Sequence, residues 1–242
     1  LCNDLCSLRP NEEKLCMSIV FDISPDAHVI KHKVSRTVIR SDCRLSYEQA
    51  DELLKDKAVA IVPTIEKELK ESLKELNVLA KQFRQKRIAK GALELEQEEM
   101  RFRLDENKFP IEIYFEQSTD AHQLIEEFML LANRIVAAEI GKKKDTKNES
   151  VEAKPFVYRV HDVPDPEKIV KLGNFIRQFG LHLRTSAKRS VQNKHINALL
   201  ESCQGTNSQT LIETLTIRSM AKAVYSTSNI GHYGLAFPYY TH

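Results

Sequence analysis

Apolar and polar residues alternate in five segments of this chain, with a period of two that is typical of β-strands with one buried face. The alternating segments are residues 15–21, 34–40, 100–104, 111–115 and 156–160. Polar turns at residues 24–26 and 105–107 separate the members of the first and second pairs. The pattern therefore predicts two β-hairpins and one further strand.

In six other segments the apolar residues recur every three or four positions, which is the period of a helix with one buried stripe. These segments are residues 46–55, 64–90, 118–140, 165–180, 191–201 and 206–220. The cap signals at their starts are the capping-box pairs Ser46 with Gln49 and Thr206 with Gln209, and Asp165 before Pro166. We therefore expect a mixed α/β fold of the α+β kind, with an antiparallel-rich sheet and packed helices.

Residues 141–154 are the least regular stretch, with lysine at 142, 143 and 144 and few apolar side chains. A solvated run of charge is the ordinary explanation, so this segment is predicted to be a flexible loop. No internal repeat and no linker between domains is evident. With 242 residues, of which 42% are hydrophobic, the chain is long enough to bury a substantial core.

Composition narrows the class of protein only slightly. The net charge of +2 neither requires nor excludes a polyanionic partner. No apolar stretch approaches the roughly 20 residues of a membrane helix, and the five cysteines are irregularly spaced. Cys2, Cys6 and Cys16 have no fourth ligand at a zinc-like spacing, so ordinary free thiols are favoured over a zinc site. We expect a cytoplasmic protein without a membrane association.

Known catalytic motifs are missing from the sequence. There is no glycine-rich phosphate loop, no HExxH zinc motif, no Gly-x-Ser-x-Gly elbow and no close cluster of aspartates. The residues alone therefore indicate no catalytic group and no metal ligand. Tyr47, in the first turn of a short helix, is most simply a packing residue. Glu126 shares one side of an apolar helix with His122 and Asn133, and is either paired, at the rim, or held for a ligand.

Five blocks of sequence, in order along the whole chain, resemble the catalytic domain shared by ribonuclease II and ribonuclease R. The blocks are NDLCSLRPNE at residues 3–12, RLSYEQA at 44–50, LIEEFMLLAN at 124–133, YRVHD at 158–162 with Pro164 and Asp165, and GHYGLA at 231–236 with YTH at 240–242. The helix block and the last block favour the ribonuclease R branch.

The resemblance implies a 3′→5′ exoribonuclease that uses Mg²⁺ to hydrolyse single-stranded RNA to nucleoside 5′-monophosphates. Residues 1–242 would form part of one such catalytic domain, truncated at both ends. In this family the metal-binding aspartates precede the block that begins at Asn3, so they are expected upstream of Leu1. The chain would then contain no catalytic and no metal-binding residue, would be inactive alone, and would need no obligate protein partner.

The resemblance also implies roles for Tyr47 and Glu126. By their place in the motifs, both are similar to family residues that contact the sugar near the 3′ end of the RNA. A ribose 2′-hydroxyl can donate to a carboxylate and accept from a phenol, whereas deoxyribose offers neither bond. Leu95 stands where some bacterial members have an aromatic side chain that stacks on the terminal base, and leucine offers only apolar contact there.

Two other functions remain open from the sequence. The chain could belong to a non-catalytic RNA-binding or scaffold protein of the same fold, which would lack the aspartate cluster upstream. It could also be a generic α/β module without any role in RNA metabolism, in which case five ordered motifs would be a coincidence.

Overall fold

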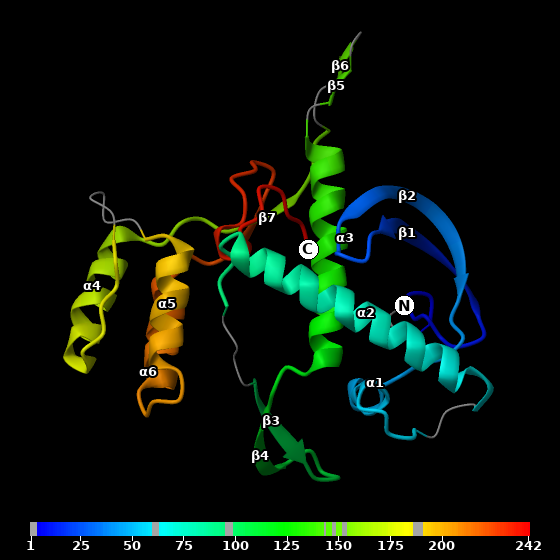
Figure 1. Ribbon diagram of the computed structural model, residues 1–242, viewed down its shortest axis with the longest axis horizontal. Coiled ribbons are helices and arrows are strands. Elements are labelled where there is room, and N and C mark those ends of the chain that lie inside the picture. The colour runs from blue at the N-terminus through cyan, green and yellow to red at the C-terminus, as the bar shows by residue number, and fades with distance from the viewer. Residues whose placement is uncertain are drawn as a thin grey trace. The chain divides into compact units, whose positions relative to one another are not determined.

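The computed structural model describes residues 4–59, 63–94, 99–142, 144–146, 149–151, 154–185 and 191–242 (Figure 1). Its contacts group into two compact units. The first unit comprises Leu1–Arg84 and Gln97–Met129, and the second comprises Gln85–Glu96 and Leu130–His242. Each unit is described by itself below.

Helices and antiparallel strands are both present, which confirms the mixed α+β class. The helices are α1 (Tyr47–Leu54), α2 (Pro63–Ala89), α3 (Asp120–Gly141), α4 (Pro166–Ile176), α5 (Asn193–Cys203) and α6 (Gln209–Ser219). The strands are β1 (Glu13–Ile23), β2 (Val29–Arg40), β3 (Glu99–Leu104), β4 (Pro110–Glu116), β5 (Lys144–Thr146), β6 (Glu149–Val151), β7 (Tyr158–Val160) and β8 (Val224–Ser226). Within the described residues these strands form four separate two-stranded sheets rather than one larger sheet.

Both predicted hairpins are present in the first unit. β1 pairs antiparallel with β2, and β3 pairs with β4. In the second hairpin, Met100 faces Phe115 and Phe102 faces Ile113, so these four side chains share one face. That apolar face is about half exposed. The opposite face carries a pairing of arginine with glutamate, in which Arg103 lies 2.6 Å from Glu112.

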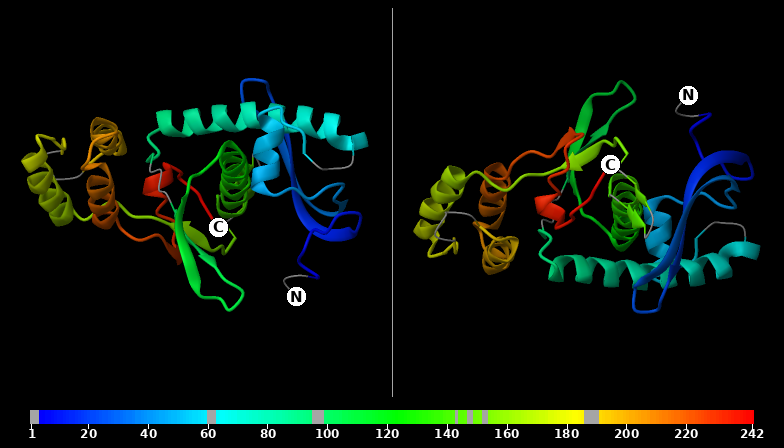
Figure 2. Two further views of the ribbon diagram at one scale, coloured as in Figure 1. Left: turned by 90° about the horizontal axis from the view of Figure 1, so that it is seen from below. Right: turned by 90° about the horizontal axis from the view of Figure 1, so that it is seen from above.

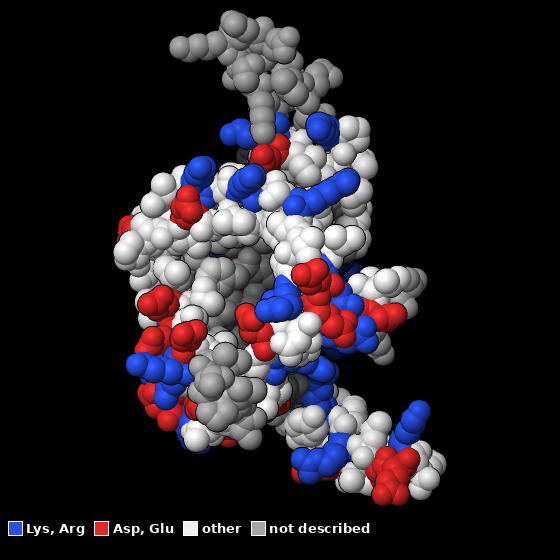
Figure 3. Space-filling view, turned by 90° about the vertical axis from the view of Figure 1, so that its right-hand side faces the viewer, with Lys and Arg blue, Asp and Glu red and all other residues white. Residues whose placement is uncertain are grey.

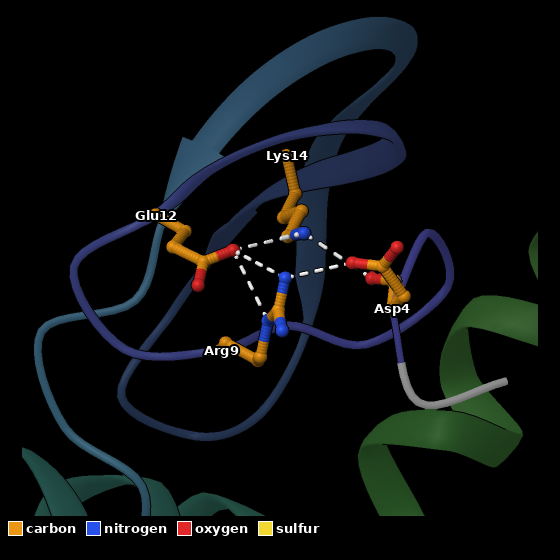
Figure 4. Close-up of polar contacts among 4 residues, drawn as sticks. All are labelled: Asp4, Arg9, Glu12 and Lys14. Atoms are coloured by element: carbon orange, nitrogen blue, oxygen red, sulfur yellow. Dashed lines mark hydrogen bonds and ion pairs between the residues drawn. The ribbon is translucent and has the colours of Figure 1, made fainter. Parts of the chain in front are cut away.

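Charges of both signs are interspersed on the molecular face shown in Figure 3. A local example lies before β1, where the Arg9 guanidinium bridges the carboxylates of Asp4 and Glu12 at 2.8 and 3.0 Å (Figure 4). The Lys14 ammonium lies 3.0 Å from Glu12 and also donates to the main-chain carbonyl of Asp4. The hydrogen bond from Lys14 holds the pKa of Glu12 below its usual value. This network ties residues 4–12 to the start of the strand.

Two of the three predicted helix caps are confirmed. The amide N–H of Gln49 donates to the Ser46 hydroxyl at 3.2 Å, and the N–H of Ser46 donates to the Gln49 side chain at 2.8 Å, which completes the capping box of α1. Asp165 accepts from the N–H of Glu167 at the start of α4. A short 3₁₀ turn follows α4 and ends at Gly180.

The capping box predicted at Thr206 and Gln209 is wrong. The N-cap of α6 is Ser208, which makes no side-chain capping bond. Thr206 instead donates its hydroxyl to the carbonyl of Cys203 at the end of α5, at 2.6 Å, and Gln209 accepts from the N–H of Gly205. The hydroxyl was already engaged by the preceding helix, so it was not available to cap the next one.

The described parts of the segment 141–154 are also more regular than predicted. α3 continues to Gly141, and β5 pairs antiparallel with β6 through Lys144 opposite Val151 and Thr146 opposite Glu149. The loop prediction is therefore corrected over these strands, because a backbone hydrogen-bond ladder needs no apolar side chains. The flexibility of this segment stays a prediction.

The second unit has several apolar clusters. Helices α4, α5 and α6 pack around Leu172, Ile176, Leu199, Cys203 and Ile212. A separate cluster joins Ala137 near the end of α3 to Tyr158 and Val160 of β7. Here Gly141 allows a very close approach, because a Cβ atom at this position would overlap the Tyr158 phenol.

Two glycine substitutions test this packing. Gly141→Ala is expected to lower the free energy of unfolding by about 1–3 kcal/mol, because the buried Tyr158 ring must shift. Gly173→Ala, within α4, meets nothing within 4 Å and is expected to raise it by about 0.5–1 kcal/mol through helix propensity. Urea denaturation followed by circular dichroism measures both. Equal effects of the two changes would contradict the assigned Gly141–Tyr158 contact.

Candidate functional site

Tyr47 lies on the first turn of α1, where the capped Ser46 fixes the start of the helix. Its side chain is exposed, with 44% of the residue surface accessible to solvent. One face of the ring stacks on the imidazole of His122, with the ring centroids 3.8 Å apart and the planes 19° from parallel. Tyr47 is therefore both stacked on a neighbouring ring and accessible from solvent.

His122 is itself held in place by the start of α3. Its Nδ1 lies 2.7 Å from the Thr119 hydroxyl and accepts from the Thr119 N–H at 3.4 Å. The ring orientation is therefore set by the residue that precedes the helix. This bond and the stacking together restrict the orientation of the Tyr47 ring.

Glu126 follows His122 by four residues on α3, one turn along the same helix face, where such side chains are neighbours. It is partly buried and has interactions with its surroundings. Tyr47 stacks on His122, and Glu126 lies one turn further along α3 from that histidine, so the two predicted residues belong to the same unit. Asn133 belongs to the second unit.

A buried carboxylate fixes α1 against the start of α3. Asp51, only 7% exposed, accepts from the N–H of Ala121 at 3.0 Å. That N–H is one of the helix N-terminal donors without a partner inside the helix, and negative charge is favourable at this end of a helix. Both views in Figure 2 show α1 beside α3. Because Asp51 is one turn beyond Tyr47, this bond also places Tyr47 near His122.

Helix α2 is attached to the same point. The Asp120 carboxylate accepts from the Asn77 amide at 3.0 Å and from the Lys81 ammonium at 2.6 Å. The hydrogen bond from Lys81 lowers the pKa of Asp120, so this carboxylate is ionised at neutral pH. Three helices therefore meet where Tyr47, His122 and Glu126 lie.

The sequence placed His122 on one side of a helix with Glu126, but it did not indicate that His122 stacks on Tyr47. For Asp51 the available signal was its spacing of four from Tyr47, which places both on one face of α1. Their partners on α3 are far away along the chain, so the spacing could not reveal them. The prediction about Leu95 lies outside the described residues.

Metal ligands and membrane segments can be assessed only in the described part of the chain. There, no three His, Cys, Asp or Glu side chains come close enough together to hold a metal ion. No helix among the described residues is both long and apolar enough to cross a membrane. The described residues thus do not fit a Mg²⁺ site, and we derive no chemical step through one.

Comparison with known proteins identifies the family. The family model described as the RNB domain matches residues 1–242. The chain belongs to the RNB domain family. It is similar to ribonuclease R of Thermotoga maritima, with 36% identity over all of this chain and 32% of that protein. It therefore spans about a third of this relative, and the resemblance drawn from the five sequence blocks is confirmed.

Solved structures of RNB proteins show the same fold. The structure of Mycoplasma genitalium RNase R in complex with ribose methylated single-stranded RNA matches with a TM-score of 0.85 and 25% identity, over 99% of this chain and 35% of that one. Yeast Ssd1, described as a pseudonuclease, matches with a TM-score of 0.64 and 21% identity, over 98% of this chain and 27% of that one. The likeness to Ssd1 shows a shared fold alone.

Removing the buried carboxylate tests the support of the site. Asp51→Ala is expected to lower the free energy of unfolding by about 0.5–2 kcal/mol, because the N–H of Ala121 loses its cap. The matched control is Glu52→Ala, at the next, exposed position of α1, which should change stability by less than about 0.5 kcal/mol. Urea titrations of the two variants provide the comparison, and equal stabilities would contradict a role for Asp51.

Proposed function

We propose that this chain is part of a ribonuclease R-type 3′→5′ exoribonuclease, which hydrolyses single-stranded RNA to nucleoside 5′-monophosphates. The observation that carries the proposal is the stack of Tyr47 on His122, with Glu126 one turn further along α3, in a chain whose relatives are named ribonuclease R. The RNA complex of the Mycoplasma genitalium enzyme, which shares the fold, adds support. In this proposal the chain contributes part of the wall along which the RNA lies.

Tyr47 and Glu126 would read the sugar of the RNA near its 3′ end. The phenol can donate to, or accept from, a 2′-hydroxyl, and the carboxylate can accept from it. His122 would act as a positioning residue, since it stacks on the Tyr47 ring without needing to touch the RNA. A net charge of +2 and the mixed surface charge in Figure 3 favour such local contacts over a broad cationic field.

The catalytic ions would be held elsewhere in the parent protein. Because the described residues offer no suitable cluster, we propose that Mg²⁺ is bound by aspartates outside this chain, and that no residue of the chain is catalytic. The chain alone would then be inactive. We further propose that the parent acts in the cytoplasm and needs no obligate protein partner.

A non-catalytic RNA-binding or scaffold protein is the second candidate. The fold is shared by yeast Ssd1, which is described as a pseudonuclease, so the fold by itself does not carry activity. The presence or loss of an aspartate cluster in the parent protein distinguishes the two candidates.

Conservative substitutions test the reading of the sugar. In the full-length parent, Tyr47→Phe keeps the ring that stacks on His122 and removes the hydroxyl, and Glu126→Gln keeps the shape and removes the charge. Tyr47→Phe is expected to reduce the preference for a 3′-terminal ribose over deoxyribose by about tenfold, the equivalent of one hydrogen bond. Glu126→Gln is expected to reduce it by a smaller factor, because the amide oxygen can still accept but carries no charge. The measurement is the ratio of kcat/KM for two oligonucleotides that differ only in that sugar.

Two controls accompany this measurement. Tyr114→Phe changes an exposed tyrosine on β4, and Glu52→Gln changes an exposed carboxylate on α1. Both should leave the ratio unchanged. If Tyr47→Phe and Glu126→Gln leave it unchanged as well, neither residue reads the sugar.

A separate experiment tests the proposal that the residues that bind the catalytic ions lie outside this chain. The purified chain is expected to release no mononucleotides from a poly(A) oligonucleotide in the presence of Mg²⁺, whereas the full-length parent should release them, because the ions would be anchored outside the chain. Thin-layer chromatography of the products measures both. Robust degradation by the chain alone would show that it holds a catalytic centre of its own, and an inactive parent would favour the scaffold function.

A further inference from the structure

Two features of the structure lie outside the site of Tyr47 and Glu126. The first is a cavity of about 670 Å³ beside the start of α5, in the second unit. The side-chain amide of Asn193 links the walls of this cavity, because it donates to the main-chain carbonyls of Gly91 and Tyr233 at 2.6 and 2.7 Å.

Two histidines also line this cavity, and both accept main-chain hydrogen bonds through Nδ1. His161 accepts from the N–H of Gly234 at 3.0 Å, and His232 accepts from the N–H of Leu235 at 3.2 Å. Burial, with His161 nearby, lowers the pKa of His232 to about 4, and burial also lowers the pKa of His161. These contacts account for the wall of the cavity within the second unit itself.

The second feature is the apolar face of the β3–β4 hairpin in the first unit, whose strands are labelled in Figure 1. Alternation along the two strands places six large apolar side chains on this face. They are Met100, Phe102 and Leu104 of β3, and Ile111, Ile113 and Phe115 of β4. Their exposed fractions lie between 48% and 63%, so none of them belongs to the buried core.

The opposite face of the hairpin provides partners for its own polar groups. The Arg103 guanidinium lies 2.6 Å from the Glu112 carboxylate and 5.9 Å from the centre of the Tyr114 ring. An antiparallel sheet commonly has one polar face in solvent and one apolar face packed against another element. The polar face therefore suits solvent, and the apolar face is the one that suits a partner.

The apolar hairpin face needs a cover for two reasons. Contiguous exposed apolar patches of several hundred Å² mark interaction sites on soluble proteins. In addition, an isolated two-stranded hairpin is only marginally stable in water, and β3 and β4 pair with no third strand in the described part of the chain. Packing of another element on this face would stabilise the hairpin.

The face suits neither RNA nor a second copy of the chain. None of its six side chains is cationic, so it has no group to neutralise a phosphate. Half-exposed side chains of this size present roughly 80–100 Å² each. Two copies packed face to face would therefore bury roughly 1,000–1,200 Å² in total, less than the roughly 1,600 Å² of a standard stable interface.

We propose that the apolar hairpin face is covered, in the parent protein, by a helix or sheet from the part of the polypeptide outside residues 1–242. The chain spans about a third of ribonuclease R of Thermotoga maritima, so a parent of similar length has ample sequence to supply such an element. A segment of the same polypeptide has a high effective concentration, so a small apolar contact is sufficient. The inference rests on the proposed function only in that the parent is longer than this chain.

Hydroxyl-radical labelling followed by mass spectrometry measures the exposure of these side chains without any substitution. The full-length parent and the chain of 242 residues are labelled under the same conditions. Labelling follows exposed area, and the centre of an interface is fully buried, so Met100, Phe102 and Phe115 are expected to react about fivefold more slowly in the parent. Equal rates in the two proteins would overturn the proposal.

Two side chains serve as internal controls for this comparison. Tyr114, on the polar face, should react at the same rate in both proteins, and the buried Phe83 should be protected in both. Protection of the apolar face that requires added oligoadenylate would identify RNA as the occupant, and protection that grows with the concentration of the chain would identify a second copy. Either result would overturn the proposal.

A pair of variants of the full-length parent provides a test that does not need the isolated chain. Phe102→Ser and Tyr114→Ser each remove one exposed aromatic ring from the same hairpin, but from opposite faces. Phe102→Ser is expected to raise the labelling of Met100 and Phe115 about twofold or more, because these neighbours lose their cover, whereas Tyr114→Ser should leave it unchanged. Equal effects of the two variants would contradict a cover on the apolar face.

The labelling does not depend on nuclease activity. An inactive parent with a protected hairpin would therefore contradict the proposed function and support this inference. An active parent with an unprotected hairpin would contradict this inference alone.

Discussion

The hydrogen bond between the Asp51 carboxylate and the N–H of Ala121 is the constraint on which the candidate site depends. A carboxylate that is 93% removed from solvent must have a partner, and a helix N-terminus offers donors that nothing else satisfies. Each group therefore provides the partner that the other requires, and the bond holds α1 against the start of α3. The same arrangement places Tyr47 on His122.

Local signals in the sequence correctly predicted the elements whose structure depends on a single turn or hairpin. The capping box at Ser46, the cap at Asp165 and both long hairpins depend on neighbours within a few residues. The prediction failed at Thr206 because a preceding helix competed for the same hydroxyl. It also did not indicate that the strands of the described residues form separate two-stranded sheets, because the pairing between hairpins is not encoded in their alternation.

The candidate site could be predicted only in part. The residues alone left Tyr47 as a packing residue and left three explanations open for Glu126, and only resemblance to a family assigned roles to them. Spacing related His122 to Glu126 but could not relate it to Tyr47, since the stacking joins segments that are far apart along the chain. The cavity beside α5 could not be predicted for the same reason. Gly91, Asn193 and Tyr233 are far apart along the chain and come together only after folding.

The two histidines next to that cavity, His161 and His232, make the stability of the second unit depend on pH. Their folded pKa values are depressed, so in moderately acidic solution an unfolded chain binds protons there that the folded chain does not. For His232 this difference operates from its ordinary value of about 6.5 down to about 4. The free energy of unfolding therefore rises with pH across that window, and acidification loosens the second unit through the ring nitrogens that organise its C-terminal segment.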